Sequence, residues 1–172
     1  MHYLTKDEFK ALLRHVSNPR HKLMLKVGVL HGLRVSELVG LRKEDIQDGH
    51  VSVRRLKGSL HTIQPFVKVD DPELDESKEL CTLYNSLRDG EFVFPMSRFN
   101  VNKIIEKAGK LAGIPRHKLH PHILKHSCAM WGIKKMDIHM VRQYLGHRSL
   151  SSTGEYLKAN DEEASRAFSG VF

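Results

Sequence analysis

The sequence predicts a mainly α-helical domain with one small antiparallel β-sheet, which is an α+β fold. Along most of the chain, apolar residues recur at helical spacing behind residues that cap helices. One stretch, which begins at His50, instead alternates β-branched and polar residues. With 172 residues and no repeat, low-complexity tract or long linker, the chain suits one domain over residues 1–172, or one domain plus an extension.

Helix signals open the chain. Thr5 and Glu8 form a capping box, in which each residue bonds the other's backbone at a helix start. Asn18-Pro19 is an N-cap followed by proline at the first helical position. The helix that follows reaches about residue 30 and is ended by His31-Gly32. A short helix is predicted over 35–39, where Gly40 stops it.

A β-hairpin is predicted over the alternating stretch, residues 51–69. Lys57-Gly58-Ser59 interrupts the alternation, and the glycine allows a turn that places Lys57 at the hairpin tip. Phe92–Phe94 is predicted as a short strand or an extended link before Pro95. Helical patterns return over 75–88, 97–112, 117–131, 136–146, 151–158 and 161–168.

The charge balance indicates a polyanionic partner. The chain has 28 Lys and Arg against 20 Asp and Glu, a net charge of +8, and 12 His besides. Nucleic acid is the usual partner of such a chain, although a merely basic surface gives the same count. Cys81 and Cys128 lie in no CxxC motif, which favours a reducing compartment without a disulfide framework. No apolar run reaches the roughly 20 residues of a membrane span, and the N-terminus is not a signal peptide.

The first candidate for chemistry is HGLRVSEL, residues 31–38. Arg34 follows a glycine turn at the start of a helix, where a guanidinium and free backbone N–H groups together suit a phosphate. Glu37, one turn further on, is placed to orient Arg34. A surface arginine with a plain ion pair fits the same letters. Lys57, at the hairpin tip, is placed to deliver a proton, or is a solvated turn lysine.

A second candidate is HPHILKHSCAMW, residues 120–131. His122, Lys125 and His126 are spaced to share one helix face. Two histidines at that spacing can bind zinc, but the metalloprotease motif HExxH needs a glutamate where Ile123 stands, and no acidic third ligand or CxxC is near. His126 also fits a buried, hydrogen-bonded histidine.

A third candidate is YLGHRSLSSTGEY, residues 144–156. Gly146 lets the chain turn out of a helix and present His147, and Ser151 or Ser152 caps the next short helix. Tyr156 lies one turn inside that helix. A tyrosine whose ring packs on the domain is the plainer interpretation of this residue.

Taken together, these residues resemble the catalytic domain of the tyrosine recombinases, the phage integrase family, from about Thr5 to Lys158. GLRVSEL matches the family's first arginine box, and Lys57 matches its hairpin lysine. His122-Ile-Leu-Lys125-His126 matches the HxLRH box, and Leu145-Gly146-His147 the LGH box. Tyr156 stands where the family has its nucleophile, nine residues past that histidine. Four boxes in order at family spacing form a specific signal.

The resemblance implies a site-specific DNA recombinase or integrase that acts through a 3′-phosphotyrosine intermediate, without metal, ATP or another cofactor. Tyr156 would attack phosphorus, and His122 would accept its proton. Lys57 would protonate the leaving 5′-oxygen. Glu37 and His126 would support the residues that contact the phosphate. The phosphate oxygens would be surrounded by Arg34, Lys125 and His147.

Lys125 departs from the family pattern, which has arginine there. A lysine keeps the charge but lacks the bidentate fork, and one poorly aimed donor in such a site costs on the order of 100-fold in rate. This departure leaves open a weakened or regulatory domain that binds DNA without cleaving it. A second alternative is a relaxing enzyme of the type I topoisomerase kind, which shares the tyrosine chemistry.

The resemblance also implies partners. Double-stranded DNA is the expected substrate, and a tetramer on DNA, monomeric in solution, is the expected assembly. The family's N-terminal core-binding domain is not expected in this chain, and residues 159–172 are expected to dock on a neighbouring protomer or to fold back. The expected location is the cytoplasm, with a bacterial, archaeal or viral origin. The residues predicted to follow DNA phosphates are Arg42, Lys43, Arg54, Arg55, Lys103, Lys107, Lys110 and Arg148.

Overall fold

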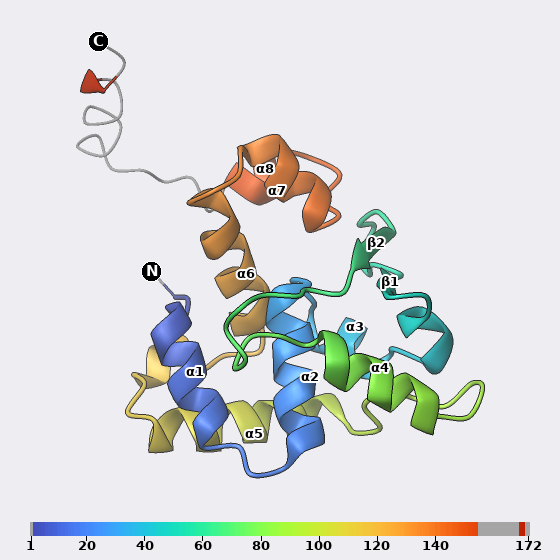
Figure 1. Cartoon of the computed structure of the whole chain (residues 1–172). Coiled ribbons are helices and arrows are strands. Elements are labelled where there is room, and N and C mark those ends of the chain that lie inside the picture. The colour runs from blue at the N-terminus through green and yellow to red at the C-terminus, as the bar shows by residue number, and fades with distance from the viewer. Residues whose placement is uncertain (1, 155–168, 171–172) are drawn as a thin grey trace.

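The computed structural model describes residues 2–154 and 169–170 and confirms the predicted fold class. Within that part of the chain, the fold is mainly helical, and a single two-stranded antiparallel sheet lies at one side of the helices (Figure 1). The elements are α1 (Lys6–Arg14), α2 (Pro19–Leu30), α3 (Val35–Val39), η1 (Lys43–Ile46), β1 (His50–Val53), β2 (Thr62–Pro65), α4 (Ser77–Ser86), α5 (Arg98–Leu111), η2 (Arg116–Lys118), α6 (Ile123–Ile133), α7 (Ile138–Tyr144) and α8 (Ser151–Gly154).

Helix α2 is the centre of the domain. Every residue from Leu23 to Val29 is buried, so this helix is apolar around most of its circumference rather than along one stripe. It packs against α6, and α1 packs against α5. A Cβ added to Gly28 would lie 2.6 Å from Leu124 Cδ1 of α6, so a side chain at this position would require Leu124 to move.

The predicted helix starts at the beginning of the chain are confirmed. Thr5 accepts a hydrogen bond from the backbone N–H of Glu8, and the Glu8 carboxylate accepts one from the N–H of Thr5. The Asn18 side chain accepts from the N–H groups of Arg20 and His21. These bonds satisfy backbone donors that a helix cannot satisfy itself.

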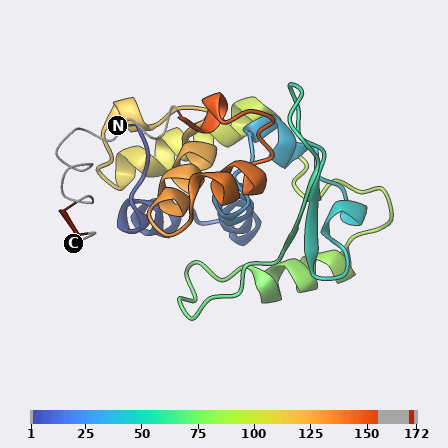
Figure 2. The same ribbon diagram turned by 90° about the horizontal axis from the view of Figure 1, so that it is seen from above.

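The hairpin is present but its strands are shorter than predicted. β1 pairs with β2 from His50 opposite Pro65 to Val53 opposite Thr62, and residues 54–61 form a long loop (Figure 2). Lys57 and Gly58 both adopt positive φ, at 55° and 73°, so the turn lies where the glycine predicted it. Phe92–Phe94 is the extended link, with one isolated bridge to Arg42, rather than a strand.

The prediction of one helix over 117–131 is wrong. η2 ends at Lys118, and α6 begins only at Ile123 with His122 as its N-cap residue. Pro121 explains the break, because proline disfavours helical geometry in the residue before it. His122 therefore stands at the mouth of α6, and Lys125 lies one turn inside the helix.

The predicted helix over 75–88 is present as α4, which is two residues shorter at each end. Of the predicted helix over 151–158, the structure describes α8, and the segment 161–168 lies outside the described residues. No helix in the described part of the chain is long and apolar enough to span a membrane.

Gly146 provides a test of how the α7–α8 turn is held against the hairpin. Its φ is +68°, and a Cβ would lie 2.6 Å from the Leu60 carbonyl oxygen. Gly113 has a φ of +72° but no atom within 4 Å of such a Cβ, which makes it a matched control. Both Gly→Ala variants should lose about 1 kcal/mol of unfolding free energy through the positive φ. Gly146→Ala should lose about 1–3 kcal/mol more through the backbone clash, measured by urea denaturation. Equal losses in the two variants would contradict this account.

Candidate active site

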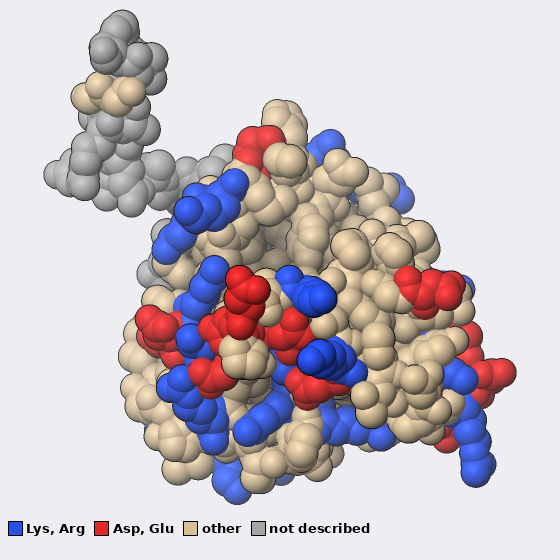
Figure 3. Space-filling view, in the orientation of Figure 1, with Lys and Arg blue, Asp and Glu red and all other residues tan. Residues whose placement is uncertain are grey.

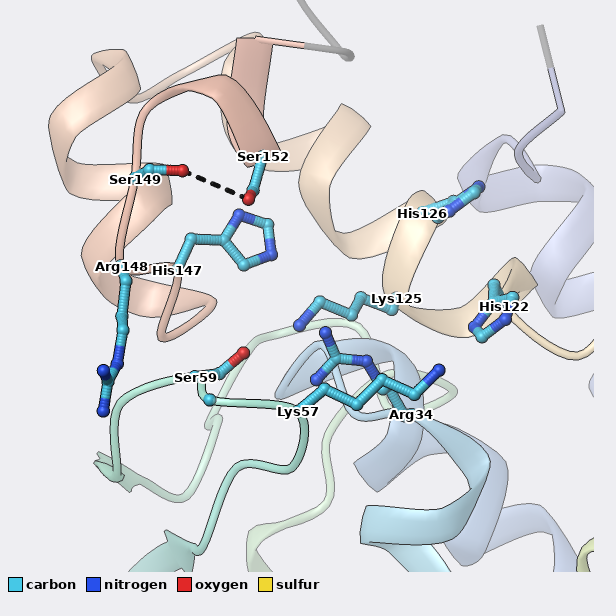
Figure 4. A pocket seen from close by; sticks show the side chains of 11 residues that line it. Arg34, Lys57, Ser59, His122, Lys125, His126, His147, Arg148, Ser149 and Ser152 are labelled. Carbon is cyan, nitrogen blue, oxygen red and sulfur yellow. Dashed lines mark hydrogen bonds between the residues drawn. The ribbon is translucent and has the colours of Figure 1, made fainter.

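A pocket of about 630 Å³ lies where four distant segments of the chain meet. The turn before α3, the hairpin loop, the start of α6 and the α7–α8 turn each contribute to its wall (Figure 4). Of the described residues that line it, none is acidic. The lining residues are Arg34, Lys57, Gly58, Ser59, His122, Lys125, His126, His147, Arg148, Ser149 and Ser152.

Arg34 is held rigidly at the start of α3. Its Nη1 donates to Glu37 Oε1 at 2.8 Å and to the Leu56 carbonyl oxygen at 3.3 Å. Its backbone N–H donates to Glu37 Oε2 at 2.8 Å. The side chain is 18% exposed and extends along the floor of the pocket between Lys57 and Lys125. These bonds fix one edge of the guanidinium and leave its remaining donors for an anion.

Glu37 is the buried anion beneath this cationic pocket, because its side chain has no exposed surface. Besides Arg34, the carboxylate accepts from the backbone N–H of Leu56 at 3.0 Å and faces Arg55 Nη1 at 3.5 Å. Burial by itself raises the pKa of Glu37. The backbone hydrogen bonds from Arg34 and Leu56, with the charges of Arg55 and Lys125, outweigh burial, so the pKa is lowered. Glu37 therefore stays ionised and joins Arg34 to the hairpin.

Lys125 extends from α6 into the pocket beside Arg34. Lys125 is 4% exposed, and its Nζ donates a hydrogen bond to the Leu145 carbonyl oxygen at 3.3 Å. Burial, followed by the charges of Arg34 and Arg55, lowers the pKa of this amine to about 8. Since a lysine normally titrates near 10.4, this one loses its charge within the range in which many enzymes work.

His147 leaves the α7–α8 turn and is 6% exposed. Its Nδ1 lies 2.9 Å from Thr153 Oγ1 of α8, and the ring points into the pocket. Burial, followed by the charges of Lys125 and Arg34, lowers the pKa of His147 to about 4. At neutral pH the imidazole is therefore uncharged, and with Nδ1 engaged by Thr153 the Nε2 atom is left for a ligand.

Lys57 and His122 border the pocket on its more open side. Lys57 is exposed on the hairpin loop, and its side chain reaches across the pocket toward Arg34 (Figure 4). Partial burial, then the charges of His120 and Lys57, lowers the pKa of His122. The His122 ring stacks on that of His126 with centroids 6.1 Å apart. Burial is also the first cause that lowers the pKa of His126 to about 4.

His122 and His126, whose spacing in the sequence is compatible with zinc, are not part of a larger ligand group among the described residues. His122 stands at the N-cap and His126 within the helix, and no set of three or more His, Cys, Asp or Glu side chains converges to hold a metal ion within the described residues. The aromatic contacts of these rings with His120 and with each other involve stacked and edge-on imidazoles instead.

Arg55 is the clear error among the predicted phosphate contacts. Its side chain has no exposed surface and is enclosed by backbone carbonyls, so its guanidinium is not presented to DNA. The alternating pattern of the strand indicates this burial, because residue 55 continues the inward-facing positions of Val51 and Val53. Its neighbour Arg54 is exposed.

The other predicted DNA contacts have different surroundings. Arg148 is exposed at the rim of the pocket. Arg42 lies 4.1 Å from the centre of the Phe92 ring and donates to the Gly90 carbonyl, and Lys43 pairs with Asp89 at 2.9 Å. Figure 3 shows one face of the molecule on which acidic and basic side chains are interspersed. The net charge of the chain is therefore not spread as a uniform basic coat.

Sequence reasoning missed the hydroxyl groups of Ser59, Ser149 and Ser152 as part of the pocket wall. It also missed the bond between Thr153 and His147, although the run of hydroxyl residues after His147 was the available signal. Tyr156 lies outside the described residues; the described part of α8 ends at Gly154, two positions before it.

The fold and the pocket define an α+β domain suited to hold a phosphate among cations and neutral imidazoles. The chain belongs to the phage integrase family, whose sequence model matches residues 2–163. It is 30% identical to the type 1 fimbriae regulatory protein FimE of Escherichia coli K12, over 92% of this chain and 86% of FimE. It is 32% identical to tyrosine recombinase XerA of Thermococcus kodakarensis, over 95% of this chain and 60% of XerA.

A solved structure shares the fold. The XerH site-specific recombinase, in a pre-cleavage complex with its difH substrate, matches with a TM-score of 0.72 and 19% identity. The match covers 98% of this chain and 54% of the XerH chain. This chain therefore spans most of FimE but little more than half of the XerA and XerH chains.

The charge on Lys125 should be visible in the titration of His147. In Lys125→Met, loss of the neighbouring positive charge makes protonation easier, so the pKa of His147 should rise from about 4 yet stay below 6.5, because burial persists. NMR of the imidazole signals measures this pKa. Lys57→Met is the control, because Lys57 acts on His122 and should raise the pKa of that ring instead. An unchanged His147 pKa in Lys125→Met would contradict the pocket electrostatics.

Proposed function

We propose that the chain is the catalytic domain of a site-specific DNA recombinase that breaks and rejoins strands through a 3′-phosphotyrosine intermediate. The observation that carries this proposal is the convergence of Arg34, Lys57, Lys125 and His147, from four distant segments, on one pocket. Membership of the phage integrase family and the similarity to XerA, which is named a tyrosine recombinase, support it.

The first task of the pocket is to stabilise charge. In the transition state, negative charge grows on the two nonbridging oxygens of the phosphodiester. Arg34 and Lys125 present fixed cations there, and His147 donates a neutral hydrogen bond from Nε2–H while Nδ1 is held by Thr153. Such donors are effective because they are already oriented before the reaction begins.

The second task is to move two protons. The Tyr156 phenol oxygen attacks phosphorus as its proton passes to His122, whose lowered pKa keeps it neutral and able to accept. The bond to the 5′-oxygen breaks, and Lys57 donates the proton that this oxygen takes up. The protein–DNA bond keeps the phosphodiester energy, so rejoining by a 5′-hydroxyl requires neither ATP nor a metal ion in this scheme.

Double-stranded DNA is the proposed partner, and the XerH complex supports it by carrying a DNA substrate on the same fold. The proposed phosphate contacts are the exposed cations Arg42, Arg54 and Arg148, the half-buried Lys43, and Lys103, Lys107 and Lys110 of α5. Contacts of this kind give affinity that depends steeply on salt and little on sequence. We place the reaction in the cytoplasm, because relatives such as FimE and XerA come from a bacterium and an archaeon.

The proposed working assembly is a tetramer on two duplexes. Residues 159–172, which end in Phe168, Val171 and Phe172, are the proposed contact with a neighbouring protomer. Those residues are outside the described part of the chain apart from 169–170. Mass photometry of the protein with and without DNA measures the order of assembly.

The proposal predicts a covalent protein–DNA adduct that depends on Tyr156. A pool of random-sequence duplexes, each with a nick, traps the intermediate because the short 5′-hydroxyl fragment diffuses away. In EDTA and without ATP, the native chain should give an SDS-stable adduct, and Tyr156→Phe should give none. Sequencing the captured DNA identifies the site.

The outcomes of this assay separate the rival functions. Tight binding without an adduct would refute cleavage and favour the regulatory domain that Lys125 suggests. An adduct with plasmid relaxation but no recombinant product would favour the topoisomerase alternative. An adduct that appears only after a metal ion is added would refute the metal-independent scheme.

The rate of adduct formation should reveal the titration of Lys125. With a lowered pKa of about 8, Lys125 carries its charge below that pH and loses it above, whereas an arginine stays charged throughout. The ratio of kcat/KM for Lys125→Arg to that of the native chain should therefore exceed 1 and rise as pH passes from 7 to 9.5. Taking the ratio cancels the ionisation of Tyr156, which is common to both proteins. A ratio independent of pH would refute the role given to Lys125.

A further inference from the structure

Arg55 lies on the hairpin loop, and its side chain contacts several segments that are far apart in the chain. Its Nε donates to Thr62 Oγ1 of β2 at 3.0 Å. Its Nη1 donates to the Gly32 carbonyl at 2.8 Å and faces Glu37 at 3.5 Å. Its Nη2 donates to the carbonyls of His31 at 2.9 Å and Tyr144 at 3.2 Å. One buried guanidinium thus joins the end of α2, α3, β2 and the end of α7.

Each residue that Arg55 contacts lies within three positions of a pocket residue in the chain. His31 and Gly32 immediately precede the turn that carries Arg34. Arg55 itself is two positions before Lys57, and Tyr144 is three positions before His147. The hydrogen bonds of a single side chain therefore set how the three segments lie relative to one another, although Arg55 does not line the pocket.

The chemistry of these acceptors makes arginine specifically suited to the position. His31 and Gly32 directly follow the last residue of α2, and Tyr144 is the last residue of α7. At the C-terminal end of a helix, carbonyl groups lack partners within the helix and carry partial negative charge. A planar guanidinium with five N–H groups can serve several such acceptors at fixed angles. An ammonium group has three donors and no fixed plane.

Glu37 links this arrangement to the catalytic cation. The same carboxylate that faces Arg55 also accepts two bonds from Arg34 and one from the Leu56 N–H. The two arginines therefore share one buried anion. A shift of Arg55 displaces the carboxylate and, through it, Arg34.

We propose that Arg55 is a positioning residue that aligns Arg34, Lys57 and His147 around one phosphate without contacting the substrate. This inference rests on the proposed function in identifying that phosphate with the scissile phosphate of DNA. A misplacement of about 1 Å in such a site can cost on the order of 100-fold in rate, so loss of this alignment has a large kinetic effect.

The test compares Arg55→Lys with Arg88→Lys. Both variants keep the charge, so neither leaves Glu37 without a cation nearby, and Arg88 is an exposed arginine that neither lines the pocket nor belongs to the proposed phosphate contacts. Arg55→Lys should bind DNA within threefold of the native affinity but form the adduct at least 30-fold more slowly at saturating DNA. Arg88→Lys should keep the native rate at saturation.

A second measurement makes the test independent of cleavage. Hydrogen–deuterium exchange should be faster in Arg55→Lys over residues 56–61 and 144–149, and unchanged over α1 and α5. If the native chain forms no adduct, the proposed function fails, and exchange alone decides whether Arg55 holds these segments. Native exchange in both segments, or an adduct rate within threefold of native, would overturn the inference.

If Arg55→Lys does not fold, Thr62→Val takes its place. This variant removes only the acceptor for Arg55 Nε at the hairpin and keeps the side-chain shape. It should remain folded with a melting temperature only a few degrees below native, because one buried donor loses its acceptor. It should also accelerate exchange over 56–61 and slow adduct formation several-fold. Thr62→Val with native exchange and a native rate would overturn the inference.

Discussion

The pocket depends on one buried carboxylate, that of Glu37. Arg34, Arg55 and Lys125 lie close enough for their charges to influence one another, and the described residues that line the pocket include no acid. Without a counter-charge, three cations brought this close would repel and would also lose hydration. The buried carboxylate of Glu37 supplies that charge beneath the pocket. Its hydrogen bonds to Arg34 and to the hairpin backbone also fix the positions of these two segments.

This arrangement explains how the pocket remains open to an anion while its cations stay in place. Arg34 and Arg55 already donate some of their hydrogen bonds to Glu37 and to backbone carbonyls. Their side chains are therefore held in place before a phosphate binds. Lys125 is less well satisfied, with one carbonyl acceptor at 3.3 Å, and burial lowers its pKa to about 8. A bound phosphate would favour its charged form, so anion binding and protonation of Lys125 are coupled.

Much of the fold was predictable because its signals are local. The caps at Thr5 and Asn18 and the glycine turn after Lys57 each depend on residues within a few positions. Pro121 shows the same principle in a missed case, because its effect on helical geometry was available in the sequence but was not weighed against the helical pattern over 117–131. Arg54 and Arg55 were both predicted as phosphate contacts from their charge alone, whereas the alternation along the strand separates the exposed Arg54 from the buried Arg55.

The sequence by itself determined the class of fold, the order of the elements and the spacing of the residues that match the family boxes, because hydrophobic period, caps and motif letters are properties of short segments. Only the tertiary structure decided which groups the inward-facing Arg55 meets, namely Glu37 and the carbonyls of His31, Gly32 and Tyr144, and that Thr153 holds His147. Those contacts join segments far apart in the chain. Which acceptors a buried cation meets depends on how whole helices pack, and no short stretch of sequence records that packing.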